Sequence, residues 1–213
     1  MIANMDTDHL SSVVDLHMIA FGQRSSFTTR LGPAIVRLIY DTFRTEGFAY
    51  VFLSSGEVAG LLAGTFVKSQ KAYYRMFLRH PIRIAGLSAW AAIRQPALIP
   101  PILTKCVFLA RSSMSGGGPS KAETDAEPKV AHALSIAVSL EHRGEGIARK
   151  LWLHALEDLP EMHGVDVIVG TVLADDAATN GLYTKMGFDV VKRTENEIKW
   201  CFYRRQGCEA PVS

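Results

Sequence analysis

The sequence predicts a single α/β (α+β) domain, in which helices and strands alternate along 213 residues. Three observations support this fold class. The first third contains two amphipathic helical patterns followed by two strands and a turn. Near residue 140 an apolar strand enters a glycine-rich turn and then a helix. A second strand and helix follow, and the length is sufficient for one hydrophobic core.

Two helices and a hairpin are expected in the N-terminal third. Asp8 can cap the first helix, and Pro33 suits the first turn of the second helix. Strands are expected at 48–53 and 58–67, with a hairpin turn at 54–57. The apolar positions of the first helix are Leu10, Val13, Val14, His17, Ala20 and Phe21.

Residues 68–111 are expected to form a basic helical insertion. No acidic residue lies between Glu57 and Glu123, whereas nine basic residues do. Prolines divide the segment into short helical pieces. The basic residues are Lys68, Lys71, Arg75, Arg79, Arg83, Arg94, Lys105, Arg111 and Lys121.

Several roles for this insertion stay open. It can be a solvated insertion packed on the domain, a helix lying on an anionic membrane, or a cap that attracts a phosphorylated acceptor. No nucleic-acid-binding motif accompanies the charge, so nucleic acid is not an expected partner. Residues 112–129 are rich in Ser, Gly and Pro and are expected to be a flexible linker.

A glycine-rich turn at 143–146 carries the strongest functional signal. Gly144 and Gly146 allow a sharp turn and close approach of a ligand, and Arg143 adds a guanidinium. The helix that follows has unpaired N–H groups in its first turn. A phosphorylated ligand is therefore expected here. The apolar side of that helix contains Ile147, Ala148, Leu151, Trp152, Ala155, Leu156 and Leu159, and Pro160 is expected to end it.

Two other phosphate-binding motifs do not fit this turn. A P-loop needs a longer loop that ends in Gly-Lys-Ser/Thr. A dinucleotide fingerprint needs a third glycine where this chain has Arg149, and its acidic residue should end a second strand, whereas Asp166 begins one. A purely structural strand-turn-helix remains the alternative.

A second strand and helix lie further along the chain. Residues 165–172 alternate in the manner of a strand, and Asp176 lies where a helix should begin. The helix is expected over 177–186, closed by Gly187. Asn180 and Tyr183 lie three residues apart on one side of it.

Together these segments resemble the GNAT superfamily of N-acetyltransferases. The first motif is Arg143-x-x-Gly146-x-Ala148 directly after the strand, and the second is the stretch from Asn180 through Tyr183 to Phe188. The resemblance covers 130–204 strongly and 6–67 weakly. It implies one acetyltransferase domain over 1–213, with a mixed, mostly antiparallel sheet flanked by helices, and acetyl-CoA as cosubstrate.

The resemblance also implies roles for individual residues. The strand 135–138 would separate from the strand 165–172 and leave a wedge for the pantetheine arm. Main-chain groups of Ile136 and Val138 would pair with pantetheine, and Tyr183 would be the general acid for the departing thiolate. A tyrosine packed on the cofactor is the alternative. The expected cofactor-binding residues are Ile136, Ala137, Val138, Arg143, Gly144, Gly146, Ile147, Ala148 and Asn180.

The general base has less support in the sequence. His132 lies at the start of the strand that leads to the thioester, and the pKa of histidine is close to the operating range. A surface histidine without a role, or Glu57 acting through a water chain, are the alternatives.

The expected function is transfer of acetyl from acetyl-CoA to an amine in a ternary complex. A small molecule or an amino sugar is the favoured acceptor, and the alternative is a non-catalytic acyl-CoA-binding module. A cytoplasmic protein is expected, in which residues 68–111 could contact the inner face of a membrane or an anionic acceptor. No metal site is expected from the spacing of Cys and His, and monomer and homodimer both stay open.

Overall fold

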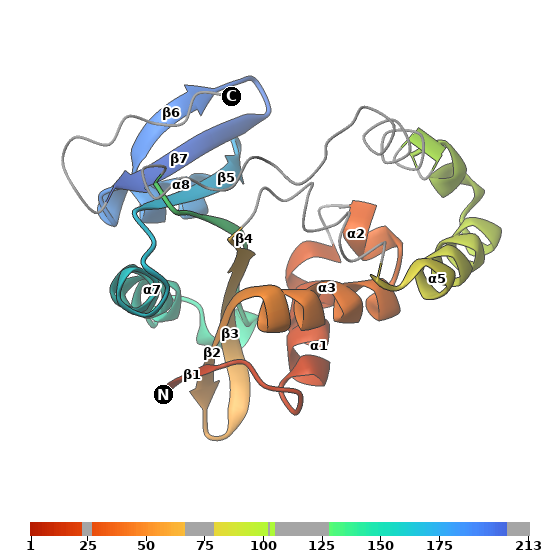
Figure 1. The fold of residues 1–213 in the computed structure, drawn as a ribbon, viewed down its shortest axis with the longest axis horizontal. Helices are drawn as coiled ribbons and strands as arrows, with labels where there is room; N and C mark the ends of the chain where they lie inside the picture. Colours follow the sequence, from red (N-terminus) through yellow and green to blue (C-terminus); the bar gives the residue numbers. More distant parts are fainter. Residues whose placement is uncertain (23–26, 67–78, 102, 105–127, 204–213) are drawn as a thin grey trace.

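A seven-stranded sheet forms the centre of the molecule, in the order β1-β2-β3-β4-β5-β7-β6 (Figure 1). The computed structural model describes residues 1–22, 27–66, 79–101, 103–104 and 128–203. Among the described strands, only β4 and β5 pair in parallel, which confirms the predicted mixed, mostly antiparallel sheet. The strands are β1 (Ile2–Asn4), β2 (Gly47–Ser54), β3 (Glu57–Thr65), β4 (Val130–Val138), β5 (Val167–Leu173), β6 (Asp189–Arg193) and β7 (Glu197–Tyr203).

Different helices cover the two faces of this sheet. Figure 1 shows α7 on one side of β1–β3, and α1 and α3 on the other. One group of buried side chains surrounds Trp152 of α7 and another surrounds Tyr40 of α3. A third, smaller group consists of Val167, Val169 and Cys201. The helices are α1 (Leu10–Gly22), α2 (Phe27–Arg30), α3 (Pro33–Glu46), α7 (Ile147–His163) and α8 (Ala177–Lys185).

Several helices and turns begin or end where local patterns in the sequence predict. Pro33 begins α3, and Ser55 and Gly56 both have positive φ in the turn between β2 and β3. Asp176 caps α8 by accepting the Thr179 N–H at 3.1 Å. At α1 the prediction was wrong, because the carboxylate of Asp6 accepts the N–H groups of Asp8 and His9 at 2.9 and 3.1 Å.

Helix α7 extends one turn beyond its predicted end. Pro160 lies inside the helix, which continues to His163 and closes on Gly164 at φ 63°. A proline removes one backbone hydrogen bond. Leu159 and Pro160 are both buried, so the packing of this turn outweighs that loss.

The C-terminal strand β7 lies inside the sheet and not at its edge. β7 pairs with β5 on one side and with β6 on the other. The short strand β6 was not predicted; its side chains are exposed, so it lacks the alternation that marks a half-buried strand.

The basic insertion is helical where the structure describes it. Helix α5 (Pro81–Arg94) and the 3₁₀ turn η1 (Pro96–Leu98) both begin at a proline, so prolines divide the segment as predicted. Lys68, Lys71, Arg75, Lys105 and Arg111 lie outside the described residues, as does nearly all of the expected linker at 112–129.

Candidate active site

The parallel strands β4 and β5 separate part of the way along their length. Their recorded pairs run from Val130↔Val167 to Ala133↔Gly170, although β4 continues to Val138 and β5 to Leu173. The separation confirms the expected wedge. Within the described part of the chain, the β5-facing edge of β4 after Ala133 has no strand partner, so its backbone groups can bond to a ligand. Ile136, Ala137 and Val138 all lie on this stretch.

A β-bulge in β4 lies at the start of the wedge. Ala63 pairs with Ser135 and Gly64 pairs with Ala133, so Leu134 is the extra residue. Ala131 and Ala133 face α7, as do Ile136 and Val138, which means that the alternation shifts by one residue at the bulge. Leu134 and Ser135 therefore both point toward α1 and α3, where they line one cavity.

Beyond β4 the chain turns through η2 (Leu140–His142) into α7. Gly144 and Gly146 have φ values of 87° and 74°, which favour glycine. No side chain of the described residues caps α7, and the first helical bond runs from the Lys150 N–H to the Gly146 carbonyl. The N–H groups of the first turn are thus available to an anion beside the exposed Arg143.

Helix α7 begins very close to the sheet. A Cβ at Gly60, which pairs with Val138, would lie 2.7 Å from Ile147 Cγ2. Ile147 is buried, and Ala148 is half-buried. Because Gly60 of β3 has no side chain, the turn that precedes α7 can lie directly at the end of β4.

Tyr183 lies at the point where β4 and β5 separate. Its side chain is 3% exposed and packs on Trp152, Phe188 and Trp200. A Cβ at Gly170 would lie 2.5 Å from its hydroxyl oxygen. Burial raises the pKa of Tyr183 above its usual value, so the phenol keeps its proton. No hydrogen-bond partner for this hydroxyl is recorded among the described residues.

Asn180 joins three elements through its side-chain amide. Its Nδ2 donates to the Leu173 carbonyl of β5 at 2.9 Å, and its Oδ1 accepts from Trp200 Nε1 of β7 at 3.0 Å. In this arrangement Asn180 holds α8 on the sheet, and the amide is occupied by protein partners.

The two candidate bases lie in different parts of the sheet. His132 is half-buried in the paired part of β4, between Thr65 and Val169. Glu57 is exposed in the first position of β3, at the hairpin.

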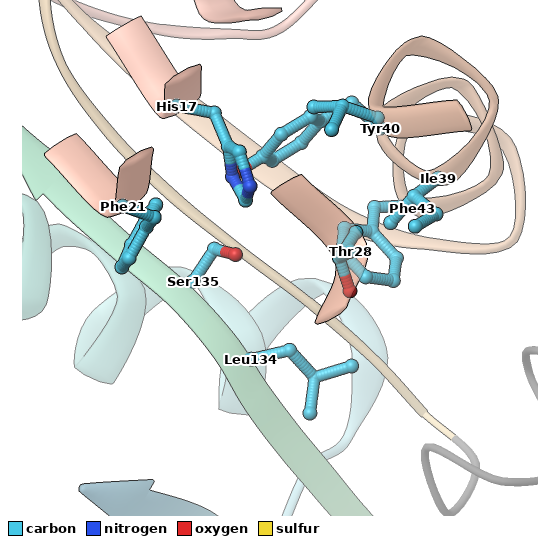
Figure 2. A pocket seen from close by; sticks show the side chains of 9 residues that line it. His17, Phe21, Thr28, Ile39, Tyr40, Phe43, Leu134 and Ser135 are labelled. Carbon is cyan, nitrogen blue, oxygen red and sulfur yellow. The ribbon is translucent and has the colours of Figure 1, made fainter. Parts of the chain in front are cut away.

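A cavity of about 200 Å³ lies between α1, α2, α3 and β4 (Figure 2). Figure 2 shows the Ser135 hydroxyl and the His17 ring directed into it. Among the residues that the structure describes, none of the lining side chains is charged while His17 is neutral. They are His17, Phe21, Thr28, Val36, Ile39, Tyr40, Phe43, Leu134 and Ser135.

His17 was assigned to the apolar side of a helix from the sequence, and its polar contacts were missed. Its Nδ1 lies 2.8 Å from the Tyr40 hydroxyl, and its Nε2 lies 3.4 Å from Thr29 Oγ1. Burial lowers the pKa of His17 to about 4, so the ring is neutral at pH 7. A histidine within an apolar helix face is the only signal that the sequence offered.

Part of the sequence matches a known family. Residues 106–188 match the model described as the acetyltransferase (GNAT) family. Over this stretch the chain is similar to GNAT acetyltransferases. The match covers β4, the turn, α7, β5 and α8, which include the wedge, the α7 N-terminus and Tyr183. No curated protein sequence matches the chain.

Solved structures show the same fold at low sequence identity. The ribosomal-protein-S18-alanine N-acetyltransferase of Escherichia coli matches with a TM-score of 0.55 and 14% identity, over 100% of this chain and 99% of that one. A putative acetyltransferase of Salmonella typhimurium, solved with acetyl-CoA, matches with a TM-score of 0.59 and 14% identity. The match covers 100% of this chain and 98% of that one. An N-acetyltransferase of Staphylococcus aureus Mu50 matches with a TM-score of 0.58 and 14% identity. The match covers 95% of this chain and 97% of that one.

The family match confirms the predicted GNAT acetyltransferase and its cosubstrate acetyl-CoA. The similar structures confirm the fold of this GNAT domain. No group of three or more metal-ligating side chains occurs among the described residues. No helix in the described ranges combines the length and apolarity that crossing a bilayer needs.

Proposed function

We propose that this GNAT domain transfers acetyl from acetyl-CoA to the nitrogen of an amine within a ternary complex. The separation of β4 from β5 after Ala133↔Gly170 carries the proposal, because it leaves a strand edge for pantetheine that ends at the uncapped α7. Leu134 to Val138 would bond pantetheine. The turn from Arg143 to Ala148 would hold the pyrophosphate.

In the transfer step the amine nitrogen attacks the thioester carbonyl carbon. A C–N bond forms, the C–S bond breaks, the amine loses one proton and the sulfur gains one. Tyr183 is the proposed donor of that proton. Its hydroxyl lies over Gly170, where the wedge begins, and the phenol is protonated at neutral pH.

His132 is the proposed base that takes the proton from the amine. It lies one residue before Ala133, the last residue of β4 that pairs with β5. A small-molecule amine is the proposed acceptor.

Thermal unfolding with saturating acetyl-CoA tests the proposal, with NAD and ATP as controls. A ligand at a hundred times its Kd stabilises a fold by about 2.7 kcal/mol, a shift of a few degrees. The wild type should shift with acetyl-CoA alone, and Arg143→Ala should shift less. Absence of any shift would remove the support for acetyl transfer.

We further propose that α5 contacts an anionic bilayer surface. Only Ile84 and Ala91 of this helix are buried, whereas Ile82, Trp90 and Ile93 are 88%, 55% and 74% exposed. Arg94 lies over the Trp90 ring at 4.6 Å, and α5 contains no acidic residue. Exposed apolar and basic side chains on one helix are what an anionic lipid surface binds.

Cosedimentation with vesicles tests this contact. Binding to phosphatidylglycerol–phosphatidylcholine vesicles should exceed binding to phosphatidylcholine alone and should fall at high salt. The double change Ile82→Ser and Ile93→Ser should weaken it several-fold. Ile19→Ser is the control, because Ile19 is 60% exposed on α1. Equal binding by both variants would overturn the proposal.

A further inference from the structure

The cavity between α1, α2, α3 and β4 lies next to the wedge, and this position makes it a candidate site for the acceptor. Its two β4 residues, Leu134 and Ser135, are the first after Ala133, the last residue that pairs with β5. The bulge directs both of these side chains to the same face. A group held in this cavity therefore lies next to the strand edge that is proposed to carry the thioester arm.

The chemistry of the lining determines what the cavity can hold. Of the nine described side chains that line it, five are hydrocarbon only: Phe21, Val36, Ile39, Phe43 and Leu134. The remaining four offer hydroxyls and one imidazole. His17 and Tyr40 bond to each other, which leaves Thr28 and Ser135 as the main polar groups for a ligand.

Charged and highly hydroxylated ligands fit this lining poorly. Burial of a cation costs several kcal/mol unless an opposite charge or good hydrogen bonds compensate, and no described residue brings a carboxylate to the cavity. Each sugar hydroxyl buried without a partner costs about 1–3 kcal/mol. An amino sugar would bring more hydroxyl groups than the two free polar side chains could satisfy.

The size of the cavity sets an upper limit on the ligand. A dry apolar cavity of about 150 Å³ in another protein binds benzene. The cavity here has a volume of about 200 Å³, which is enough for one six-membered ring or a branched chain of similar size.

We propose that this cavity binds the apolar substituent of the acceptor, so that the acceptor is a small primary amine with an aromatic or branched aliphatic group. This inference rests on the proposed acetyl transfer and specifies its acceptor class. The amine nitrogen would lie at the cavity end formed by Leu134 and Ser135, beside the wedge. The ring or branched chain would pack among α1, α2 and α3.

A panel of amines tests the acceptor class through release of CoA thiol. The probes are 2-phenylethylamine, isoamylamine, glucosamine and spermidine, each with saturating acetyl-CoA. The two apolar amines should give a kcat/KM at least about ten-fold above the other two, since one methylene in a fitted pocket is worth about ten-fold or more. Preference for glucosamine or spermidine would overturn the inference.

A cavity-filling variant tests the location. Thr28→Leu adds apolar volume from α2, which contributes nothing to the wedge, and it should raise the KM for 2-phenylethylamine about ten-fold. Thr45→Leu makes the same change at an exposed position of α3 and should leave that KM unchanged. An unchanged KM in Thr28→Leu would show that the acceptor binds elsewhere.

Acetyl-CoA binding separates failure of this inference from failure of the proposed function. Thr28→Leu should keep the wild-type thermal shift with acetyl-CoA. If the wild type shifts with acetyl-CoA and acetylates glucosamine preferentially, the cavity inference fails and acetyl transfer stands. If acetyl-CoA causes no shift in the wild type, the proposed function itself fails.

Discussion

The hydroxyl of Tyr183 lies against Gly170, so closely that a Cβ at position 170 would approach the oxygen to 2.5 Å. Tyr183 comes from α8, and Gly170 is the last β5 residue that pairs with β4. Because Gly170 has no side chain, the phenol of Tyr183 can lie where β4 and β5 separate. Four predictions concern this region and the neighbouring cavity.

Gly170→Ala should displace the Tyr183 ring from its position. Overpacking of this kind costs about 1–3 kcal/mol. Urea unfolding should show that loss, together with a lower kcat. Gly181→Ala is the matched control, because a Cβ there meets nothing within 4 Å and Ala favours the helix. Equal stability of Gly170→Ala and wild type would show that the ring moves away without cost.

The Tyr183→Phe variant should distinguish a role of Tyr183 in proton donation from a role in packing. The phenyl ring keeps the contacts with Trp152 and Phe188, and only the hydroxyl is lost. If that hydroxyl protonates the thiolate, kcat should fall by about 10²-fold or more, with the acetyl-CoA Kd unchanged. Steady-state kinetics and calorimetry measure the two quantities. A wild-type kcat would mean that Tyr183 serves in packing alone.

Asn180→Ala should destabilise the fold more than it weakens acetyl-CoA binding. The change leaves Trp200 Nε1 without its 3.0 Å partner and releases the Leu173 carbonyl. A polar group left unpaired inside a protein costs about 1–3 kcal/mol. Denaturant unfolding gives the loss of stability. Calorimetry should find a Kd near the wild-type value, whereas a large rise in Kd would indicate direct cofactor contact.

His17 should make the stability of the protein depend on pH. Its folded pKa of about 4 is below the unfolded value of 6.5, so the unfolded chain binds more protons between these values. Stability is therefore full above about pH 6.5 and falls as the pH decreases toward 4. Between pH 7.5 and 5.0 the loss attributable to His17 is about 2 kcal/mol.

Urea unfolding at pH 7.5 and pH 5.0 measures this loss. His17→Gln cannot gain a proton in that range, and its amide can still bond to Tyr40. The variant should lose about 2 kcal/mol less than the wild type between the two pH values. An identical loss in both proteins would show that His17 is solvated well enough to titrate normally.

Elements with a strong local signal could be predicted from the sequence. Pro33, the turn at Ser55 and Gly56, and the Asp176 cap each depend on neighbours in the chain, and the structure has all of them. α7 was misjudged at Pro160, because the burial of Leu159 and Pro160 is a tertiary effect. β6 was missed since an exposed strand carries no hydrophobic alternation.

The sequence by itself determined the two motifs and the glycine turn, because backbone conformation and helix periodicity are local properties. Tertiary structure alone decided where the cavity proposed for the acceptor lies. His17, Tyr40 and Ser135 come from α1, α3 and β4, and no spacing in the chain links them. Leu134 and Ser135 both point into the cavity because the register between β3 and β4 shifts by one residue. Strand pairing sets that register, so only the folded sheet could reveal it.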